Sequence, residues 1–401
     1  MRGADWLRDL LCTSYADSKI VPSGLCALRS PPARVPFALG NAAVDNFSLT
    51  IAADTQLHNR EDLIEALGLK SPLEDGDLIL AAYAKWGENC AAHLLGEFAF
   101  AIWDERRQHL FCCRDHIGFR AFLYWHSASR FVFAGDIEPI LACPSIPRAL
   151  NRRKLAALAV PTAHLLRHEE TFHSGILSLP PGMWMIVDRS GIRLRRYWEL
   201  QTGAASAIPA KPESVFEQLR ELLFQAVECR LDRERPVATL LSGGLDSSAV
   251  AAIASRHLAR KNRQLTAVAA VLPEESLGMF KDERSYIDEF KGTKNLNIRY
   301  VTAQGRGPFD SLAAPSRFAA FPLRSSRFFL DEECAKVAIQ NGAQTLLSGV
   351  GGEFGITSTG ERYYLESAIT LRWFALLRMV RNQRASAAPS ALRSLAGQVF
   401  R

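Results

Sequence analysis

The amino-acid sequence predicts a two-domain protein, an α+β sandwich followed by an α/β domain with a doubly wound parallel sheet. The chain has 401 residues, which is enough for two domains with separate hydrophobic cores. A stretch rich in Gly, Ala, Ser and Pro, residues 201–212, separates residues 1–200 from residues 213–401. Short alternating runs dominate the first part, whereas continuously apolar strands alternate with helices in the second.

The first part carries four runs with the period and composition of β-strands, and turn signals flank the last of them. The strands are expected at Phe47 to Ile51, Phe98 to Trp103, Phe131 to Ala134 and Met183 to Val187. Helical patterns near Asn59 to Leu67 and Leu78 to Trp86 interrupt them. This mixture predicts stacked antiparallel sheets with helices.

The second part alternates helices with buried strands. A helical apolar stripe covers Glu213 to Leu231, and the apolar run Val237 to Leu241 is typical of a strand that is covered on both faces. The following elements are a helix at Ser247 to Leu258, strands at Leu265 to Leu272 and Thr345 to Leu347, and a helix at Asp331 to Asn341. Such alternation predicts a parallel sheet.

The loop after the Val237 strand carries the strongest chemical signal. It consists of Ser242, Gly243, Gly244, Leu245, Asp246, Ser247 and Ser248. Glycines allow a close backbone approach, hydroxyls donate hydrogen bonds, and a helix N-terminus favours anions, so the loop suits pyrophosphate. Asp246 is a candidate ligand for magnesium. The lysine of a Walker loop is absent, so the pattern indicates an ATP-pyrophosphatase loop.

A second strand exit repeats this design. Ser348 and Gly349 follow the Thr345 strand, and Glu353 supplies a second acidic group. We expect the two loops to face one ATP. The pair Asp282 and Glu283, between the loops in sequence, is either a metal or pyrophosphate contact or a solvated helix start.

Composition restricts the remaining classes. A content of 48% hydrophobic and 22% charged residues is that of a globular protein and excludes disorder and fibres. Apolar runs fall far short of the roughly 20 residues that cross a bilayer, and the N-terminus lacks a signal-peptide pattern, so a cytoplasmic protein is predicted. The net charge of +6 does not indicate nucleic acid. The eight cysteines lack zinc-site spacing and are interpreted as small buried hydrophobes.

Residues 361–401 are rich in arginine. They contain seven arginines and only two acidic residues, Glu361 and Glu366. This excess of positive charge indicates either a local anionic partner or a solvated helix face. Two interpretations of the stretch Tyr363 to Val380 stay open. It is an amphipathic surface that binds a membrane peripherally or a maturation partner, or it is a helix that faces the core.

With these residues in view, the chain resembles the asparagine synthetase family nearly end to end. Four segments are similar to its glutaminase-type domain: Leu95 to Asp104, Arg114 to Gly118, Ile176 to Gly182 and Arg196 to Leu200. The resemblance implies an N-terminal-nucleophile sandwich of two sheets between helices, followed by a synthetase domain. It also implies ATP and Mg²⁺ as cofactors, with Leu240, Ser348 and Gly349 near the nucleoside and Asp246 and Glu353 on the metal.

Departures from the family pattern narrow the expected reaction. The glutaminase nucleophile is a cysteine exposed after loss of the initiator methionine, and Arg2 stands there. Ala53 to Asn59 lacks the Asn-Gly oxyanion donors, although Asp75 matches the acid that holds the amine of glutamine. Val350 stands where asparagine synthetases carry an acid. We therefore expect an inactive glutaminase-like domain that is retained for structure.

The lasso-peptide cyclase branch of the family fits these departures best. It implies that ATP adenylates an Asp or Glu side chain of a precursor peptide, and that the N-terminal amine of the peptide closes a macrolactam. A leader peptidase and a leader-recognition protein are the implied partners. The alternatives are an asparagine synthetase using glutamine or ammonia, a β-lactam-synthetase-like ligase, and a non-catalytic relic that binds a partner. The relic is considered because synthetase domains of the family continue well past the second loop, and we expect this chain to be short at its C-terminus by comparison.

Overall fold

The computed structural model describes residues 19–20, 26–27, 37–44, 47–70, 73–157, 169–201, 212–231, 234–274, 282–310 and 327–357. Arg2, most of the predicted linker and the arginine-rich stretch after residue 360 lie outside these residues. The chain forms two compact units, residues 1–225 with 306–329 and residues 226–305 with 330–401.

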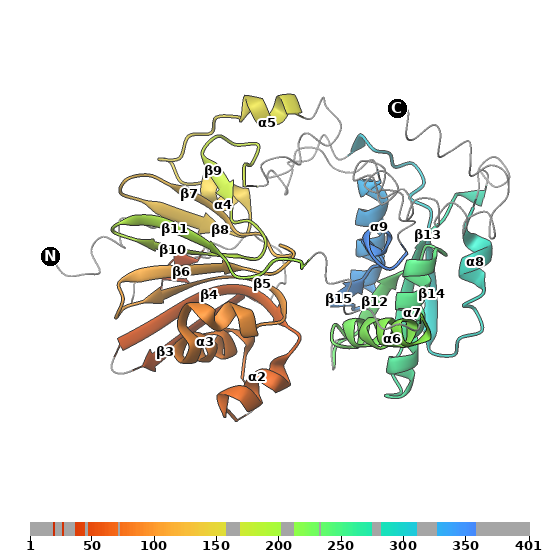
Figure 1. The fold of residues 1–401 in the computed structure, drawn as a ribbon. Coiled ribbons are helices and arrows are strands. Elements are labelled where there is room, and N and C mark those ends of the chain that lie inside the picture. Colours follow the sequence, from red (N-terminus) through yellow and green to blue (C-terminus); the bar gives the residue numbers. More distant parts are fainter. Residues whose placement is uncertain are drawn as a thin grey trace, which may run out of the picture. The chain divides into compact units, whose positions relative to one another are not determined.

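Unit 1 contains two antiparallel sheets (Figure 1). The larger has the order β11-β10-β6-β5-β4-β3 and the smaller the order β8-β7-β9. The strands of the larger sheet are β3 (Phe37–Val44), β4 (Phe47–Leu57), β5 (Gly96–Asp104), β6 (His109–Arg114), β10 (Met183–Asp188) and β11 (Gly191–Arg196). Those of the smaller are β7 (Leu123–His126), β8 (Phe131–Ala134) and β9 (Ile176–Ser178), and a separate short pair joins β1 (Lys19–Ile20) to β2 (Cys26–Ala27).

Helix α3 (Asp75–Trp86) covers the outer face of the larger sheet, and α4 (Ile137–Leu141) covers that of the smaller. The other helices of unit 1 are α2 (Arg60–Leu67), the 3₁₀ helix η1 (Gly87–His93) and α5 (Arg152–Ala157). Alternate residues of β5 enter different cores because side chains alternate across a strand. Phe98 and Phe100 pack toward α3, whereas Ala99 and Ala101 pack between the two sheets. A third cluster joins the smaller sheet to α4 through Ile137 and Ile140. The resulting layers are helix, sheet, sheet and helix, the order that the family resemblance implies.

A buried polar cluster ties α3 to the turn between β5 and β6. The hydroxyl of Tyr83 donates to Asp104 Oδ2 over 3.1 Å and lies 2.9 Å from Nε2 of His109. Nη1 of Arg107 donates to the same hydroxyl over 3.3 Å. Burial lowers the pKa of His109, which favours its neutral form, and raises that of Tyr83. The cluster therefore joins a helix to a hairpin through hydrogen bonds inside the core.

Unit 2 is built on a four-stranded parallel sheet with the order β14-β13-β12-β15. Its strands are β12 (Val237–Leu240), β13 (Leu265–Ala270), β14 (Leu296–Val301) and β15 (Thr345–Leu347). Its helices are α7 (Leu245–Ala259), α8 (Arg284–Asp288), most of α9 (Phe328–Gln340) and the 3₁₀ turn η6 (Gly352–Phe354), while α6 (Pro212–Glu228) spans the boundary between the two units. The parallel sheet is confirmed, and β14 is an additional strand that the sequence pattern did not indicate.

The strand order of unit 2 reverses next to its first strand. The chain proceeds from β12 to β13 and β14 on one side, and then returns to place β15 on the other side of β12.

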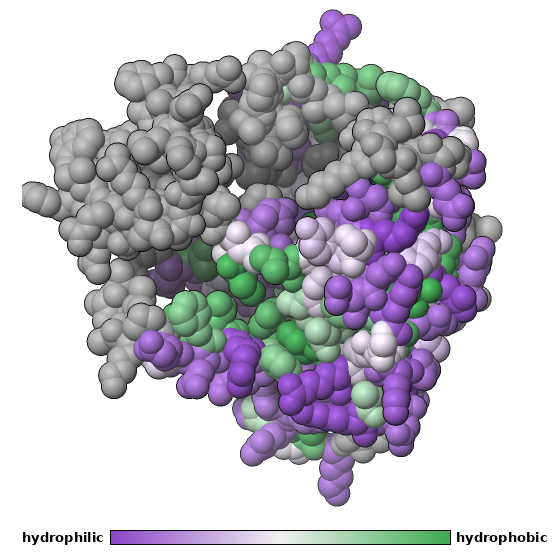
Figure 2. All heavy atoms as spheres, turned by 90° about the vertical axis from the view of Figure 1, so that its right-hand side faces the viewer, coloured by the Kyte–Doolittle hydropathy of each residue, from purple (hydrophilic) through white to green (hydrophobic). Residues whose placement is uncertain are grey.

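Figure 2 shows a largely hydrophilic surface over the described residues of one face, with apolar residues grouped near its middle. Among the described helices, none is long and apolar enough to cross a membrane.

The cysteines with described side chains are divided by burial. Cys90, Cys112, Cys113, Cys143 and Cys334 are buried, which agrees with their interpretation as small core residues. Cys229 is exposed and departs from it. Burial raises the pKa of the Cys90 thiol to about 12, so this thiol stays protonated at neutral pH.

Candidate functional site

The candidate site of unit 2 lies at the carboxyl ends of β12 and β15, the two strands that flank the reversal of strand order. Thr239 pairs with Leu347, so the strand ends that lead into the two loops lie side by side. The switch point of a parallel sheet, at the carboxyl ends of its strands, is where α/β domains bind ligands. The structure thus brings together the two loops that the sequence singled out.

The first loop is organised by hydrogen bonds among its own residues. The hydroxyl of Ser247 accepts from the backbone N–H of Ser242 over 3.1 Å and donates to the carbonyl of Gly244 over 3.1 Å. The Ser242 hydroxyl lies 2.9 Å from it. These contacts use the one donor and the two lone pairs of the Ser247 hydroxyl. In this arrangement the Ser247 hydroxyl stabilises the loop. The backbone N–H of Ser247 is then the group that is able to make the predicted phosphate contact.

Helix α7 begins directly at this loop and presents its N-terminus there. Gly244 is the N-cap residue and supplies no side-chain hydrogen bond. The first N–H groups of an α-helix have no acceptor within the helix, and together with the helix dipole they favour an anion. Residues Leu245, Asp246 and Ser247 carry these groups. The predicted pyrophosphate site therefore has the backbone donors that it needs.

The second loop packs tightly on Asp246. A Cβ added to Gly349 would lie 2.6 Å from the backbone nitrogen of Ser247, and one added to Gly352 would lie 2.3 Å from Cγ of Asp246. Real Cβ atoms do not approach so closely, so a side chain at Gly349 would meet the backbone of the first loop, and one at Gly352 would have to displace the Asp246 carboxylate. Thr357 adds a side-chain contact, since its hydroxyl donates to Asp246 Oδ2 over 3.0 Å. The carboxylate of Asp246 thus lies where the two loops meet.

The predicted metal ligands fit a nucleotide-bound cation better than a cage formed by protein alone. Glu353 follows Gly352 directly, is exposed, and accepts from the backbone N–H of Gly351 over 3.1 Å. Among the described residues, no group of three or more His, Cys, Asp or Glu side chains could hold a metal. Mg²⁺ typically binds one or two carboxylates together with phosphates and water. Asp246 and Glu353 are suited to that mode.

The segment with Asp282 and Glu283 lies against the first loop and begins a helix. A Cβ on Gly243 would lie 3.2 Å from the carbonyl of Glu283 and 2.9 Å from Cβ of Tyr286. The Asp282 carboxylate accepts from the backbone N–H groups of Leu272 and Arg284, over 3.1 and 2.6 Å. Glu283 is the N-cap of α8. Of the two interpretations left open by the sequence, this geometry matches the helix start, and a ligand contact stays a prediction.

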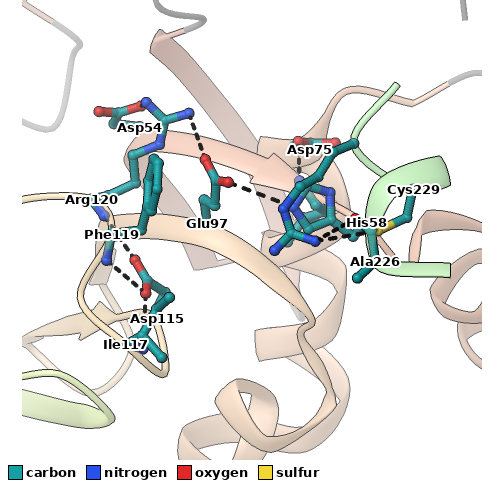
Figure 3. Close-up of polar contacts among 12 residues, drawn as sticks. Asp54, His58, Asp75, Glu97, Asp115, Ile117, Phe119, Arg120, Ala226 and Cys229 are labelled. Carbon is teal, nitrogen blue, oxygen red and sulfur yellow. Dashed lines mark hydrogen bonds and ion pairs between the residues drawn. The ribbon is translucent and has the colours of Figure 1, made fainter. Parts of the chain in front are cut away.

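A second polar site lies in unit 1, at the end of β4 that carries the stretch Ala53 to Asn59 (Figure 3). Nη1 of Arg120 lies 3.5 Å from Asp54, and Nη2 lies 3.4 Å from Glu97. His58 lies 3.9 Å from Glu97, and only 2% of its side chain is exposed. Burial raises the pKa of Asp54, Arg120 opposes this shift, and Glu97 adds to it. The cluster is therefore charged and largely removed from water.

Arg120 is held in place by the loop that precedes it. Asp115 is completely buried, and its carboxylate accepts from the backbone N–H groups of Ile117, Phe119 and Arg120 over 2.9 to 3.1 Å. The guanidinium of Arg114 donates to four acceptors in this loop and at the end of β9. This scaffold directs Arg120 onto Asp54. The sequence marked Arg114 and Asp115 as part of a motif. Nothing in it indicated that these two residues position Arg120.

Asp75, the predicted amine-holding acid, has its carboxylate engaged inside unit 1. Oδ2 accepts from the backbone N–H of Leu57 over 2.8 Å, and Arg60 forms an ion pair with Oδ1. The carboxylate of Asp54 accepts hydrogen bonds when ionised and cannot donate them in that form. Asp54 itself therefore does not supply the donor that an oxyanion hole needs.

Two glycine-rich loops at the switch point of a parallel sheet define an α/β domain of the nucleotide-binding class, joined here to a helix-covered antiparallel sandwich. Comparison with family models agrees with both parts. A glutamine amidotransferase domain model matches residues 44–198, and an asparagine synthase model matches residues 218–399. This chain belongs to the asparagine synthetase family.

Three curated relatives illustrate the similarity. Asparagine synthetase [glutamine-hydrolyzing] 3 of Bacillus subtilis is 32% identical over 53% of this chain and 35% of its own length. Amidase chry2 of Gibberella zeae is 33% identical over 61% of this chain and 36% of its own. A putative asparagine synthetase of Methanocaldococcus jannaschii is 28% identical over 52% and 41%. The chain thus spans well under half the length of these relatives.

Proposed function

We propose that this chain acts as an ATP-dependent amide ligase, which adenylates a carboxylate and transfers the acyl group to an amine. The observation that carries the proposal is the meeting of two glycine-rich loops around Asp246, at the carboxyl ends of β12 and β15. The names of the relatives, asparagine synthetases and an amidase, support amide chemistry.

The reaction balances in two steps. A carboxylate oxygen attacks the α-phosphorus of ATP, and pyrophosphate leaves with the electron pair of the broken P–O bond. The amine nitrogen then attacks the acyl carbon, AMP leaves with the electron pair of the C–O bond, and the amine gives up a proton to solvent. Mg²⁺, held by Asp246 and Glu353, would neutralise charge on the leaving pyrophosphate. The N-terminus of α7 would bind the same phosphates through backbone N–H groups.

The source of the amine is the next question. In unit 1, Asp54 and Glu97 share Arg120. The stretch Ala53 to Asn59 also lacks the Asn-Gly pair that, by the family resemblance, donates to the oxyanion in an active glutaminase domain. This arrangement supports a domain that does not release ammonia from glutamine. The amine then comes from elsewhere, and the simplest source is the molecule that carries the activated carboxylate.

We therefore propose a macrolactam synthetase of the lasso-peptide type as the specific activity. The Asp or Glu side chain of a precursor peptide is adenylated, and the N-terminal amine of the peptide closes the ring. Val350 supports a substrate other than aspartate, because by the family resemblance asparagine synthetases carry an acid at this position. Its side chain is 85% exposed and follows Gly349, which packs on Asp246 and Ser247. A leader peptidase and a leader-recognition protein are the proposed partners, in the cytoplasm.

Asparagine synthesis is the second candidate, and it is favoured by the names of two of the relatives. Both candidates share the adenylation step and differ in the acid and in the source of the amine. A chain that binds partners without catalysis is the third candidate, in which Asp246 has no chemical role.

A three-arm assay with purified protein separates these candidates. All three arms contain ATP and Mg²⁺. The first adds a precursor core peptide, and the second adds the same peptide with Asn or Gln in place of the acid. The third adds L-aspartate and either glutamine or ammonium. Ring closure is expected in the first arm only, as AMP, pyrophosphate and a peptide that has lost one water. Asparagine in the third arm would instead support the synthetase. If D246N and wild type release equally little AMP in every arm, the chain is not a ligase.

A further inference from the structure

Thr357 contacts the site from a segment that no sequence motif covers. Its hydroxyl donates to Oδ2 of Asp246 over 3.0 Å, across a separation of 111 residues. Both side chains are half-buried. The contact therefore joins the end of the second loop to the acidic residue of the first.

Backbone hydrogen bonds of the second loop place Thr357 for this contact. The N–H of Thr357 and the N–H of Gly355 both donate to the carbonyl of Gly352, over 3.1 and 3.0 Å. Gly352 in turn donates to the carbonyl of Gly349 over 3.2 Å. Gly349 and Gly352 are the two residues that pack on Asp246 and Ser247. Thr357 is thus built into the same turn that covers Asp246.

A single hydrogen bond to one oxygen has a specific effect on a carboxylate. It restricts rotation about the bond between Cβ and Cγ, and so fixes the direction in which the other oxygen points. Residues that hydrogen-bond to a metal ligand typically change metal affinity or activity by about 10-fold to 100-fold when they are removed. Threonine is suited to this task, because its branched Cβ restricts the side chain to few rotamers.

We infer that Thr357 is a positioning residue, which orients the Asp246 carboxylate for the Mg²⁺ that accompanies ATP. The inference rests on the proposed function in one respect, namely that Asp246 contacts this cation. The inference goes beyond the proposed function because it assigns a task to Thr357, which lies outside both loop motifs.

Two substitutions separate the hydroxyl from the shape of the side chain. T357V is nearly isosteric and lacks the hydroxyl, whereas T357S keeps the hydroxyl and lacks the methyl group. ATP binding to the full chain is measured by calorimetry over a series of Mg²⁺ concentrations and again without divalent metal. Mn²⁺ binding to the protein–ATP mixture is followed by electron paramagnetic resonance, and thermal unfolding checks that each variant is folded.

For T357V we expect the Mg²⁺ concentration at half-saturation to rise about 10-fold or more, with metal-free ATP binding unchanged. T357S should stay close to wild type. Equal metal dependence in T357V and wild type would overturn the inference, and so would a T357S variant that behaves like T357V. Wild type without metal-dependent ATP binding would overturn it too. Metal-dependent binding without AMP release from any acid would count against the proposed function while leaving the positioning role supported or rejected by the two variants.

Discussion

The α-carbon of Gly352 packs against the carboxylate of Asp246 so closely that a Cβ at position 352 would lie 2.3 Å from Cγ and Oδ1. The two residues belong to different loops, and this contact brings the loops together. Its consequence is that neither loop can move or gain volume there without displacing the other.

Replacement of Gly352 by alanine should disrupt the candidate site. The added methyl group must move either the Asp246 carboxylate or the second loop, and displacements of about 1 Å can lower a rate by about 100-fold. G355A is the matched control, because a Cβ on Gly355 would have no neighbour within 4 Å. AMP release measures both variants. Similar activity of G352A and wild type would show that Asp246 does not need its observed position.

Replacement of Val350 by glutamate should change acid selectivity. The exposed apolar side chain would become a carboxylate in the loop whose Gly349 and Gly352 pack on Asp246. This carboxylate would repel an acidic peptide side chain and is able to hold the ammonium group of an amino acid. We expect V350E to lower the ratio of peptide to aspartate activation by about 10-fold, which corresponds to about 1.4 kcal/mol. V350Q has the same shape without the charge, and ATP–pyrophosphate exchange measures each acid. If V350E and V350Q behave alike, the charge at this position does not decide selectivity.

The raised pKa of Asp54 has a definite effect on stability. Above its unfolded value of about 3.9, the unfolded chain loses this proton while the folded chain retains it until its higher pKa is reached. The folded form therefore binds more protons in that window, and this residue makes stability fall as pH rises through it. Urea unfolding between about pH 4 and pH 7 should show this slope in wild type and lose it in D54N. D62N, at an exposed position of α2, should keep it. An equal slope in all three would contradict the assignment.

Removal of the Tyr83 hydroxyl should destabilise unit 1. Y83F leaves Asp104 and His109 without a partner that they contact inside the core, and such losses typically cost about 1–3 kcal/mol. Chemical unfolding monitored by tryptophan fluorescence measures the change. Y286F is a suitable control, because Tyr286 is 55% exposed. A loss no larger than that of Y286F would mean that water replaces the hydroxyl at little cost.

Local elements were well predicted wherever a strand or helix has a strong period. The run Phe131 to Ala134 and the run Thr345 to Leu347 are strands with those bounds, and the Val237 strand ends one residue earlier than expected. Strands such as β6 and β14 were missed. Several of their side chains are buried or exposed on both faces, so the alternation that marks a half-covered strand is absent.

The sequence by itself determined the chemical character of the two loops, because glycines, hydroxyls and an acid at a strand exit are local properties of neighbouring residues. It also determined the family, through motifs that run along most of the chain. Tertiary structure decided which residues meet. The return of β15 to the open side of β12 places Gly352 and Thr357 on Asp246, and the buried Asp115 turn places Arg120 on Asp54. These contacts join residues far apart in the chain, and only the packing of the sheets specifies them.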